Sequence, residues 1–354
     1  MEGNLESIWQ DYGLEKLQQG IGSLFPEFKI SLSELLQKVM AGDVIGAMTG
    51  LLEEGAGSIR MQMTGLRNIL LWLVLLGIAA AVLTHFAEIF DQHQVADLGY
   101  YFMYLLFLTI LFQCFIQTAD IAEELMKNII LFMQLMFPTY LIAVGVTSGM
   151  TTVNAYSQLM TLMIYGVEQI LCRGVTRLVY VYVVLSVVNG IWAEDKLNMP
   201  AGLLKKGISF LWKVSIGMVT GISIFQTLIT PVIDSAKSSV WQKAISAIPG
   251  IGNVSEGVLE LIIGSAVVIK NSIGVVMLLL LLVLCAAPLL KIYLIVWILR
   301  LAAAVVGMVS DKRLAVCTDQ MSEGCMMMLK TAATAMLLFL IVISIIASAS
   351  NRGF

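Results

Sequence analysis

The sequence predicts an all-α, polytopic integral membrane protein with six to eight transmembrane helices. Hydrophobic residues make up 59% of the chain and charged residues 13%, whereas in a soluble domain about half are apolar and about a quarter are charged. Chargeless apolar runs long enough to cross a bilayer recur along the chain. The net charge of -3 gives no basic field for nucleic acid, so we expect no nucleic-acid partner.

The first residues form the most polar part of the chain. We predict an amphipathic N-terminal helical region over 1–66 and a polytopic membrane domain over 67–350. Ser31-x-x-Glu34 is a capping-box pattern that begins a short helix, and Asp43 is placed to cap the next one. Such short amphipathic helices can lie on the membrane surface or pack against a partner.

Eight apolar blocks follow as candidate spans. They are 68–84, 100–118, 129–146, 175–192, 208–230, 272–290, 292–308 and 330–349. The amphipathic stretch 156–172 is not counted among them. Lys291 alone separates two blocks: either it marks a tight interfacial loop, or it lies within the bilayer with Arg300 and both face protein or water. Arg60 and Arg67, before the first block, place the N-terminus in the cytoplasm by the positive-inside rule.

A Pro-Gly-Ile-Gly turn at 249–252 precedes a short apolar segment, 255–269, and then the chargeless block 272–290. That block reaches about 28 Å as a helix, close to the thickness of the hydrocarbon core. The short segment cannot span comfortably, so we expect a re-entrant or interfacial segment near 245–270. Lys270 and Asn271 stand at the join, where a helix break would need polar groups for its free backbone ends.

Glu168, Arg173 and Arg177 form the best cluster of charges beside an apolar block. Arg173 and Arg177 share a helix face, whereas Glu168 lies about 140° from Arg173 on a regular helix. Glu168 could join them only across a helix break near Gly174 or from another helix. The cluster is then a polar seam facing a water-filled lumen or another subunit. The alternative is a helix end whose arginines reach out to lipid headgroups.

No enzyme signature is present. The sequence contains no GxxxxGK[ST], HExxH or GxSxG motif, so we predict a protein that is not an enzyme and uses no cofactor. His85 and His93 have no recognised metal-ligand spacing. The five cysteines form no CxxC pair and are read as small apolar fillers. Any energy input must come from partners or gradients.

Several short motifs carry a family resemblance. They are AIPGIGNVSE from Ala247 to Glu256, GSAVVIKNSIG from Gly264 to Gly274, and LAAAVVGMVSDKR from Leu301 to Arg313. In their order and spacing the chain resembles the stage III sporulation protein AE family of endospore-forming bacteria, over most of residues 30–350.

This resemblance implies a polytopic protein of the mother-cell membrane around the forespore. It implies membership of a trans-envelope channel or secretion-like complex between mother cell and forespore, as an oligomeric, pore-forming or pore-supporting component. The implied partners are other proteins of the stage III sporulation operon, including an ATPase and ring-forming proteins, together with the lipid bilayer and further copies of the chain. Family members commonly begin with a signal sequence, which would place residues 1–66 between the two membranes instead of in the cytoplasm.

The motifs also nominate residues for gating, folding or assembly. These are Pro249, Gly250, Gly252, Lys270, Asn271, Gly274, Asp311, Lys312 and Arg313. For the glycines, a tight turn and close helix packing is the competing explanation. A secondary transporter with a midplane site at a broken helix is the alternative function. It requires a second broken segment, and the nearest candidate is 137–148.

Overall fold

A computed structural model describes residues 14–24, 31–51, 53, 71, 75, 78–79, 82, 93–148, 150–191, 197–245, 252–309 and 312–349. This described part is helical apart from residue 31, the turn at 41–43 and residue 197, which confirms the predicted all-α class. The expected span 68–84 lies almost wholly outside it.

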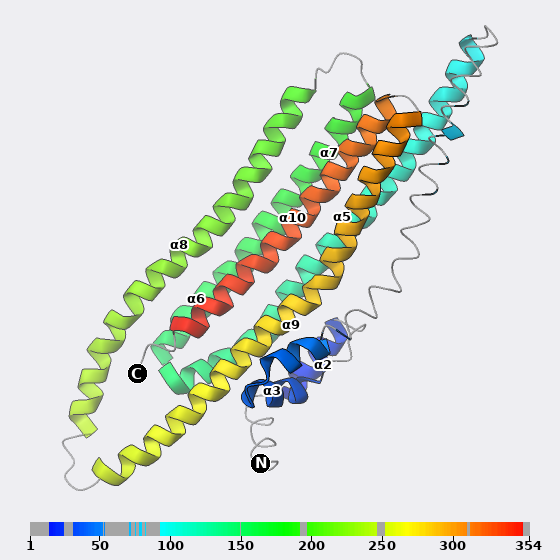
Figure 1. Ribbon diagram of the computed structural model, residues 1–354. Coiled ribbons are helices and arrows are strands. Elements are labelled where there is room, and N and C mark those ends of the chain that lie inside the picture. The colour runs from blue at the N-terminus through cyan, green and yellow to red at the C-terminus, as the bar shows by residue number, and fades with distance from the viewer. Residues whose placement is uncertain are drawn as a thin grey trace.

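Five long rods, linked end to end, make up the bundle in Figure 1. They are α5 (His93–Ser148); α6 (Met150–Gly166) continued by the π-helix η1 (Val167–Val175) and α7 (Thr176–Ile191); α8 (Asn198–Ile245); α9 (Gly252–Val309); and α10 (Lys312–Ala349). Successive rods run in opposite directions. The last helix, α10, contacts α5, α7, α8 and α9, so it forms the centre of the bundle.

Four stretches of helix are long and apolar enough to cross a membrane among the described residues. They are Tyr104–Gly145, Tyr156–Asn189, Val267–Met308 and Arg313–Ala347. The second includes the amphipathic stretch 156–172, which sequence reasoning had left out. The first and third each join two of the expected spans into one continuous helix.

The join within α9 corrects two expectations. Lys291 lies inside the helix and marks no interfacial loop, and the helix runs unbroken from Gly252 past Lys270 and Asn271. The expected separate re-entrant segment is therefore absent from the described part of 245–270. The reason is local: helix-compatible apolar residues flank Lys270, and the one proline within α9 is Pro288, which a membrane helix can tolerate.

Side chains fix the relative heights of the rods. The rings of Phe115 on α5 and Tyr180 on α7 meet edge to face with centroids 5.2 Å apart. On the other side of the bundle centre, Ser322 Oγ of α10 donates a hydrogen bond to the Val296 carbonyl of α9 at 3.2 Å.

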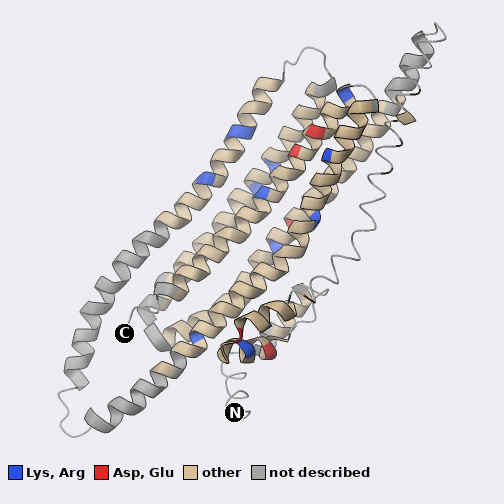
Figure 2. Cartoon of the chain, in the orientation of Figure 1, with Lys and Arg blue, Asp and Glu red and all other residues tan. Residues whose placement is uncertain are grey.

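Four charge-free segments consequently lie at similar heights. They are 128–148 on α5, 149–167 leading through α6, 271–290 on α9 and 331–349 on α10. In Figure 2 the coloured lower parts of α5, α6 and α10 are tan, and the blue and red residues of these helices lie further up the bundle. Each segment has about 20 residues, which as a helix matches the hydrocarbon core of a bilayer.

A small N-terminal hairpin packs against this lower part. It consists of α2 (Leu14–Leu24) and α3 (Leu32–Met40). Ser31 Oγ accepts a hydrogen bond from the Glu34 backbone N–H at 3.4 Å, which confirms the predicted cap. The chain then turns at Gly42, where φ is 84°, and Asp43 caps the next helix through the Gly46 N–H at 2.9 Å.

The hairpin meets α5 at a glycine. A Cβ on Gly20 of α2 would meet a terminal methyl group of Leu135 of α5, so a larger residue there would require the leucine side chain to shift. On α3, four apolar side chains are buried while Glu34 and Lys38 pair with each other on the outer face. The hairpin thus lies beside the charge-free part of α5 and α9 and carries charges on its outside.

Candidate functional site

The π-helix η1 carries the predicted polar seam. Its i→i+5 hydrogen bonding places residues five apart on the same side, so Glu168 and Arg173 meet: Arg173 Nη2 donates to Glu168 Oε1 at 2.6 Å. The Thr176 hydroxyl follows the same spacing and donates to the Leu171 carbonyl at 3.0 Å. The expected break near Gly174, or a Glu168 contributed from another helix, was the wrong explanation. A change of helix type joins these residues.

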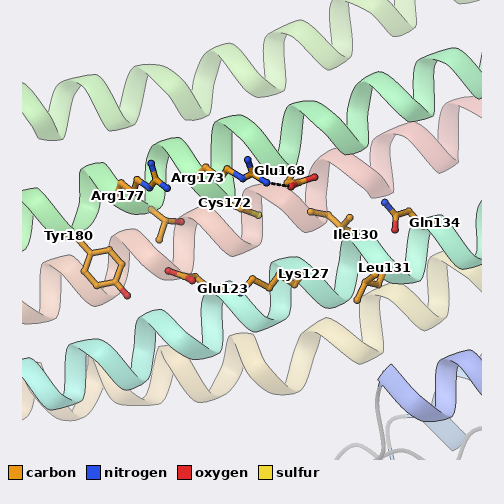
Figure 3. A pocket seen from close by; sticks show the side chains of 11 residues that line it. Glu123, Lys127, Ile130, Leu131, Gln134, Glu168, Cys172, Arg173, Arg177 and Tyr180 are labelled. Atoms are coloured by element: carbon orange, nitrogen blue, oxygen red, sulfur yellow. Dashed lines mark hydrogen bonds and ion pairs between the residues drawn. The ribbon is translucent and has the colours of Figure 1, made fainter.

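A half-open pocket of about 520 Å³ lies between this seam and α5. Its lining residues are Glu123, Lys127, Ile130, Leu131, Gln134, Glu168, Cys172, Arg173, Thr176, Arg177 and Tyr180. Figure 3 shows the α5 side chains on one wall and those of η1 and α7 on the other. The pocket therefore brings together all three predicted seam residues.

Sequence reasoning missed the α5 wall. Asp120, Glu123, Glu124 and Lys127 fall between two expected spans and so look like a connecting loop. Their spacing of three and four residues was the available signal, because it is the spacing of a helix face. The structure makes this stretch continuous with the apolar helix on both sides.

The charges in the pocket are unevenly paired. Arg173 and Glu168 are 56% and 39% exposed, and an ion pair so open to solvent contributes about 0–1 kcal/mol to stability. Within the described part of the chain, Lys127 and Arg177 make no ion pair. Three cations and two carboxylates leave one positive charge in excess.

The residues nominated for gating or assembly do not form one site. Gly252 begins α9 and Arg313 lies exposed near the start of α10, at opposite ends of the bundle. Pro249, Gly250 and Asp311 lie outside the described residues, as does the side chain of Lys312.

Lys270 and Gly274, in contrast, share one face of α9. The Lys270 side chain is fully buried, and Asn271 beside it is half-buried. A Cβ added to Gly274 would lie 3.2 Å from the Tyr140 hydroxyl of α5. For Gly274 this supports the close-packing explanation. The expected role of Lys270 and Asn271 at free helix ends does not apply, since no helix ends there.

A second polar contact ties three helices together above the charge-free segments. Glu323 of α10 accepts a hydrogen bond from the Tyr182 hydroxyl of α7 at 2.6 Å and forms an ion pair with Lys205 of α8. Trp212 of α8 donates its Nε1–H to the Thr331 hydroxyl at 3.2 Å. These contacts fix α8 to the centre of the bundle.

Neither a metal centre nor a broken-helix site is found in the part of the chain that the structure describes. No three His, Cys, Asp or Glu side chains converge there. Four of the five cysteines are buried and free, in keeping with their reading as apolar fillers. The transporter alternative loses its basis, because α9 is unbroken from Gly252 and the proposed twin at 137–148 lies within α5.

The family profile described as stage III sporulation protein AE matches residues 30–350. The chain belongs to this family. A similar curated protein is the stage III sporulation protein AE of Bacillus subtilis (strain 168), with 22% identity over 291 residues, which cover 79% of this chain and 70% of that protein. No solved structure matches the chain. The resemblance found in the motifs is thus confirmed, and the fold described above is that of a sporulation protein with membrane-type helices.

Proposed function

We propose that this protein is a membrane component of a trans-envelope channel or secretion-like complex between mother cell and forespore. It lies in the mother-cell membrane around the forespore, forms oligomers and builds or supports a pore. Its partners are other proteins of the stage III operon, including an ATPase and ring-forming proteins. The protein itself is not an enzyme, and family membership supports the sporulation role.

The observation that supports a pore is the position of the N-terminal hairpin. Gly20 meets Leu135 within the charge-free segment 128–148. If the charge-free segments span the bilayer, the hairpin lies at the depth of the hydrocarbon core. Its outer face nevertheless presents Glu34 and Lys38, which are 63% and 37% exposed.

Contact with lipid hydrocarbon would be energetically unfavourable for that face. A charged side chain in hydrocarbon costs about 2.5–3.5 kcal/mol on insertion scales, and charges within membranes almost always face protein or water. A polar lumen bounded by several copies of the α5–α9 face meets this requirement.

Cysteine accessibility tests the proposal in full-length protein reconstituted into nanodiscs. The background is Cys172→Ala, because the other four cysteines are buried. Glu34→Cys tests the hairpin face, and Leu162→Cys, at a 54% exposed apolar position on α6, is the matched control. We expect a membrane-impermeant maleimide to modify the cysteine at position 34 rapidly and the cysteine at position 162 slowly, because lipid covers the latter.

Equal protection of both cysteines in nanodiscs, with full reaction of both after denaturation, would show that lipid also covers the hairpin face. That outcome would contradict a water-filled lumen at the hairpin face, and the proposed pore would lose its supporting observation.

A further inference from the structure

The pocket between α5 and the η1–α7 wall lies where both walls change from charged to apolar residues. On α5, Glu123 and Lys127 precede the charge-free segment, and Ile130, Leu131 and Gln134 belong to it. On the facing rod, Glu168 is the first charge after the charge-free residues 149–167. The pocket therefore has a charged end and an apolar end.

This change of character coincides with the boundary expected for the membrane. The charge-free segments are as long as the hydrocarbon core is thick, so the charged end lies at headgroup depth. Below it, Leu131 of α5 is 47% exposed, and Leu162 and Tyr165 of α6 are 54% and 64% exposed. Tyrosine is enriched at membrane interfaces, and the leucines offer an apolar path toward the bilayer centre.

The pocket and the N-terminal hairpin meet neighbouring faces of α5, and Leu131 at the edge of the pocket lies one turn from Leu135 on the same face. Gln134 lines the pocket and Leu135 meets the hairpin. Adjacent residues of an α-helix point about 100° apart. Gln134 therefore points to a different side of α5 from the hairpin contact, and the inference below does not depend on the proposed channel function.

We propose that this pocket binds the phosphate of an anionic phospholipid headgroup. Lys127 and Arg177, whose charges are not taken up by ion pairs within the described chain, contact the phosphate oxygens. The planar guanidinium of Arg177 offers two parallel N–H donors, a geometry suited to phosphate. Arg173 adds positive charge while Glu168 holds its side chain in place. The acyl chains follow Tyr165 and Leu162 of α6 toward the bilayer centre.

The π-helix is what makes the site possible. A regular helix would turn Glu168 about 140° away from Arg173, so the carboxylate could not orient the arginine toward α5. Long π-helical stretches are rare and often occur at functional sites. This gives η1 a positional role at the bilayer boundary.

The test measures lipid retention by the purified full-length protein. Native mass spectrometry would compare bound phosphatidylglycerol with bound phosphatidylcholine after equilibration in mixed detergent micelles. We expect the unaltered protein to retain phosphatidylglycerol selectively, and Lys127→Gln with Arg177→Gln to reduce that selectivity about tenfold or more, as loss of two charge-assisted contacts requires. Arg177→Lys keeps the positive charge but loses the two parallel N–H donors of the guanidinium, and should reduce the selectivity for phosphatidylglycerol by an intermediate amount.

The matched control is Lys206→Gln with Lys213→Gln, which removes two exposed cations of α8 outside the pocket. It should leave selectivity unchanged. Equal loss in the control and in the pocket variant would show general charge attraction and overturn the proposal, as would unchanged retention in the pocket variant. Displacement of the lipid by millimolar inorganic phosphate or glycerol phosphate would assign the site to a soluble phosphate and overturn the lipid assignment. Circular dichroism of each variant identifies loss of fold. If the double variant is unfolded, lipid retention by the single Arg177→Lys variant tests the proposal.

Discussion

At the scale of single residues, one glycine allows the two longest described helices, α5 and α9, to approach closely. Gly274 of α9 lies against the ring of Tyr140, with its absent Cβ 3.2 Å from the hydroxyl and 3.4 Å from a ring carbon. The Tyr140 hydroxyl is buried and has no hydrogen-bond partner within the described residues. A larger side chain at position 274 must therefore displace tightly packed atoms.

Gly274→Val should lower the free energy of unfolding by about 1–3 kcal/mol, the usual cost of overpacking a filled interior. Thermal unfolding in a defined detergent measures the change. Gly264→Val is the control, because an added Cβ there meets nothing within 4 Å. Adding Tyr140→Phe to Gly274→Val should recover part of the loss, and an unchanged midpoint for Gly274→Val would contradict the packing explanation.

At the scale of elements, the sequence predicted helices well and their ends poorly. The cap formed by Ser31 and the one formed by Asp43 are both present, because a side-chain oxygen three residues before a free N–H defines a local geometry. The join across Lys291 was not predictable by hydropathy. A single charge in an apolar run is compatible with a loop or with a continuous helix, and packing against α10 decides between them.

The polar seam of Glu168, Arg173 and Arg177 shows the same limit of prediction from sequence. Arg173 and Arg177 were placed on one face, and both line the pocket although Arg173 belongs to η1 and Arg177 to α7. Glu168 was placed on another face because sequence reasoning assumed a regular helix. Nothing in the residues VEQILCRGV of η1 predicts i→i+5 backbone hydrogen bonding. The α5 wall of the pocket was missed because it depends on which rod lies opposite η1.

A pair of histidines can test the π-helix directly. In Glu168→His with Arg173→His, both imidazoles should lie on one side of η1 and bind Ni²⁺ together, which raises the melting temperature of the bundle when the metal is added. The control is Lys213→His with Met218→His, an exposed pair with the same spacing in the regular helix α8. If both pairs gain the same stability from Ni²⁺, or neither gains any, η1 is not π-helical in solution.

At the scale of the whole molecule, the fold class, the family and the membrane character all followed from composition and motif order. The alignment of the charge-free segments of α5, α6, α9 and α10 did not, because it becomes visible only when the rods are packed side by side. The same alignment shows that α5, with 56 residues and about 84 Å long, extends well beyond a single bilayer.

The four charge-free segments occupy one part of the bundle. The charged residues of α5 at 120–127 and of η1 and α7 at 168–177 lie next to these segments, Glu323 lies outside them on α10, and the hairpin lies beside them. Copies arranged with their α5–α9 faces inward would surround a polar lumen. The lipid pocket would then stand outside that lumen, at the membrane boundary.

The most direct measurement is a cryo-electron microscopy structure of the full-length protein in nanodiscs. The account predicts a ring of several copies, with lipid around the charge-free segments and the N-terminal hairpins, including Glu34, facing a water-filled centre. A single copy whose hairpin-bearing face is surrounded by lipid would contradict it.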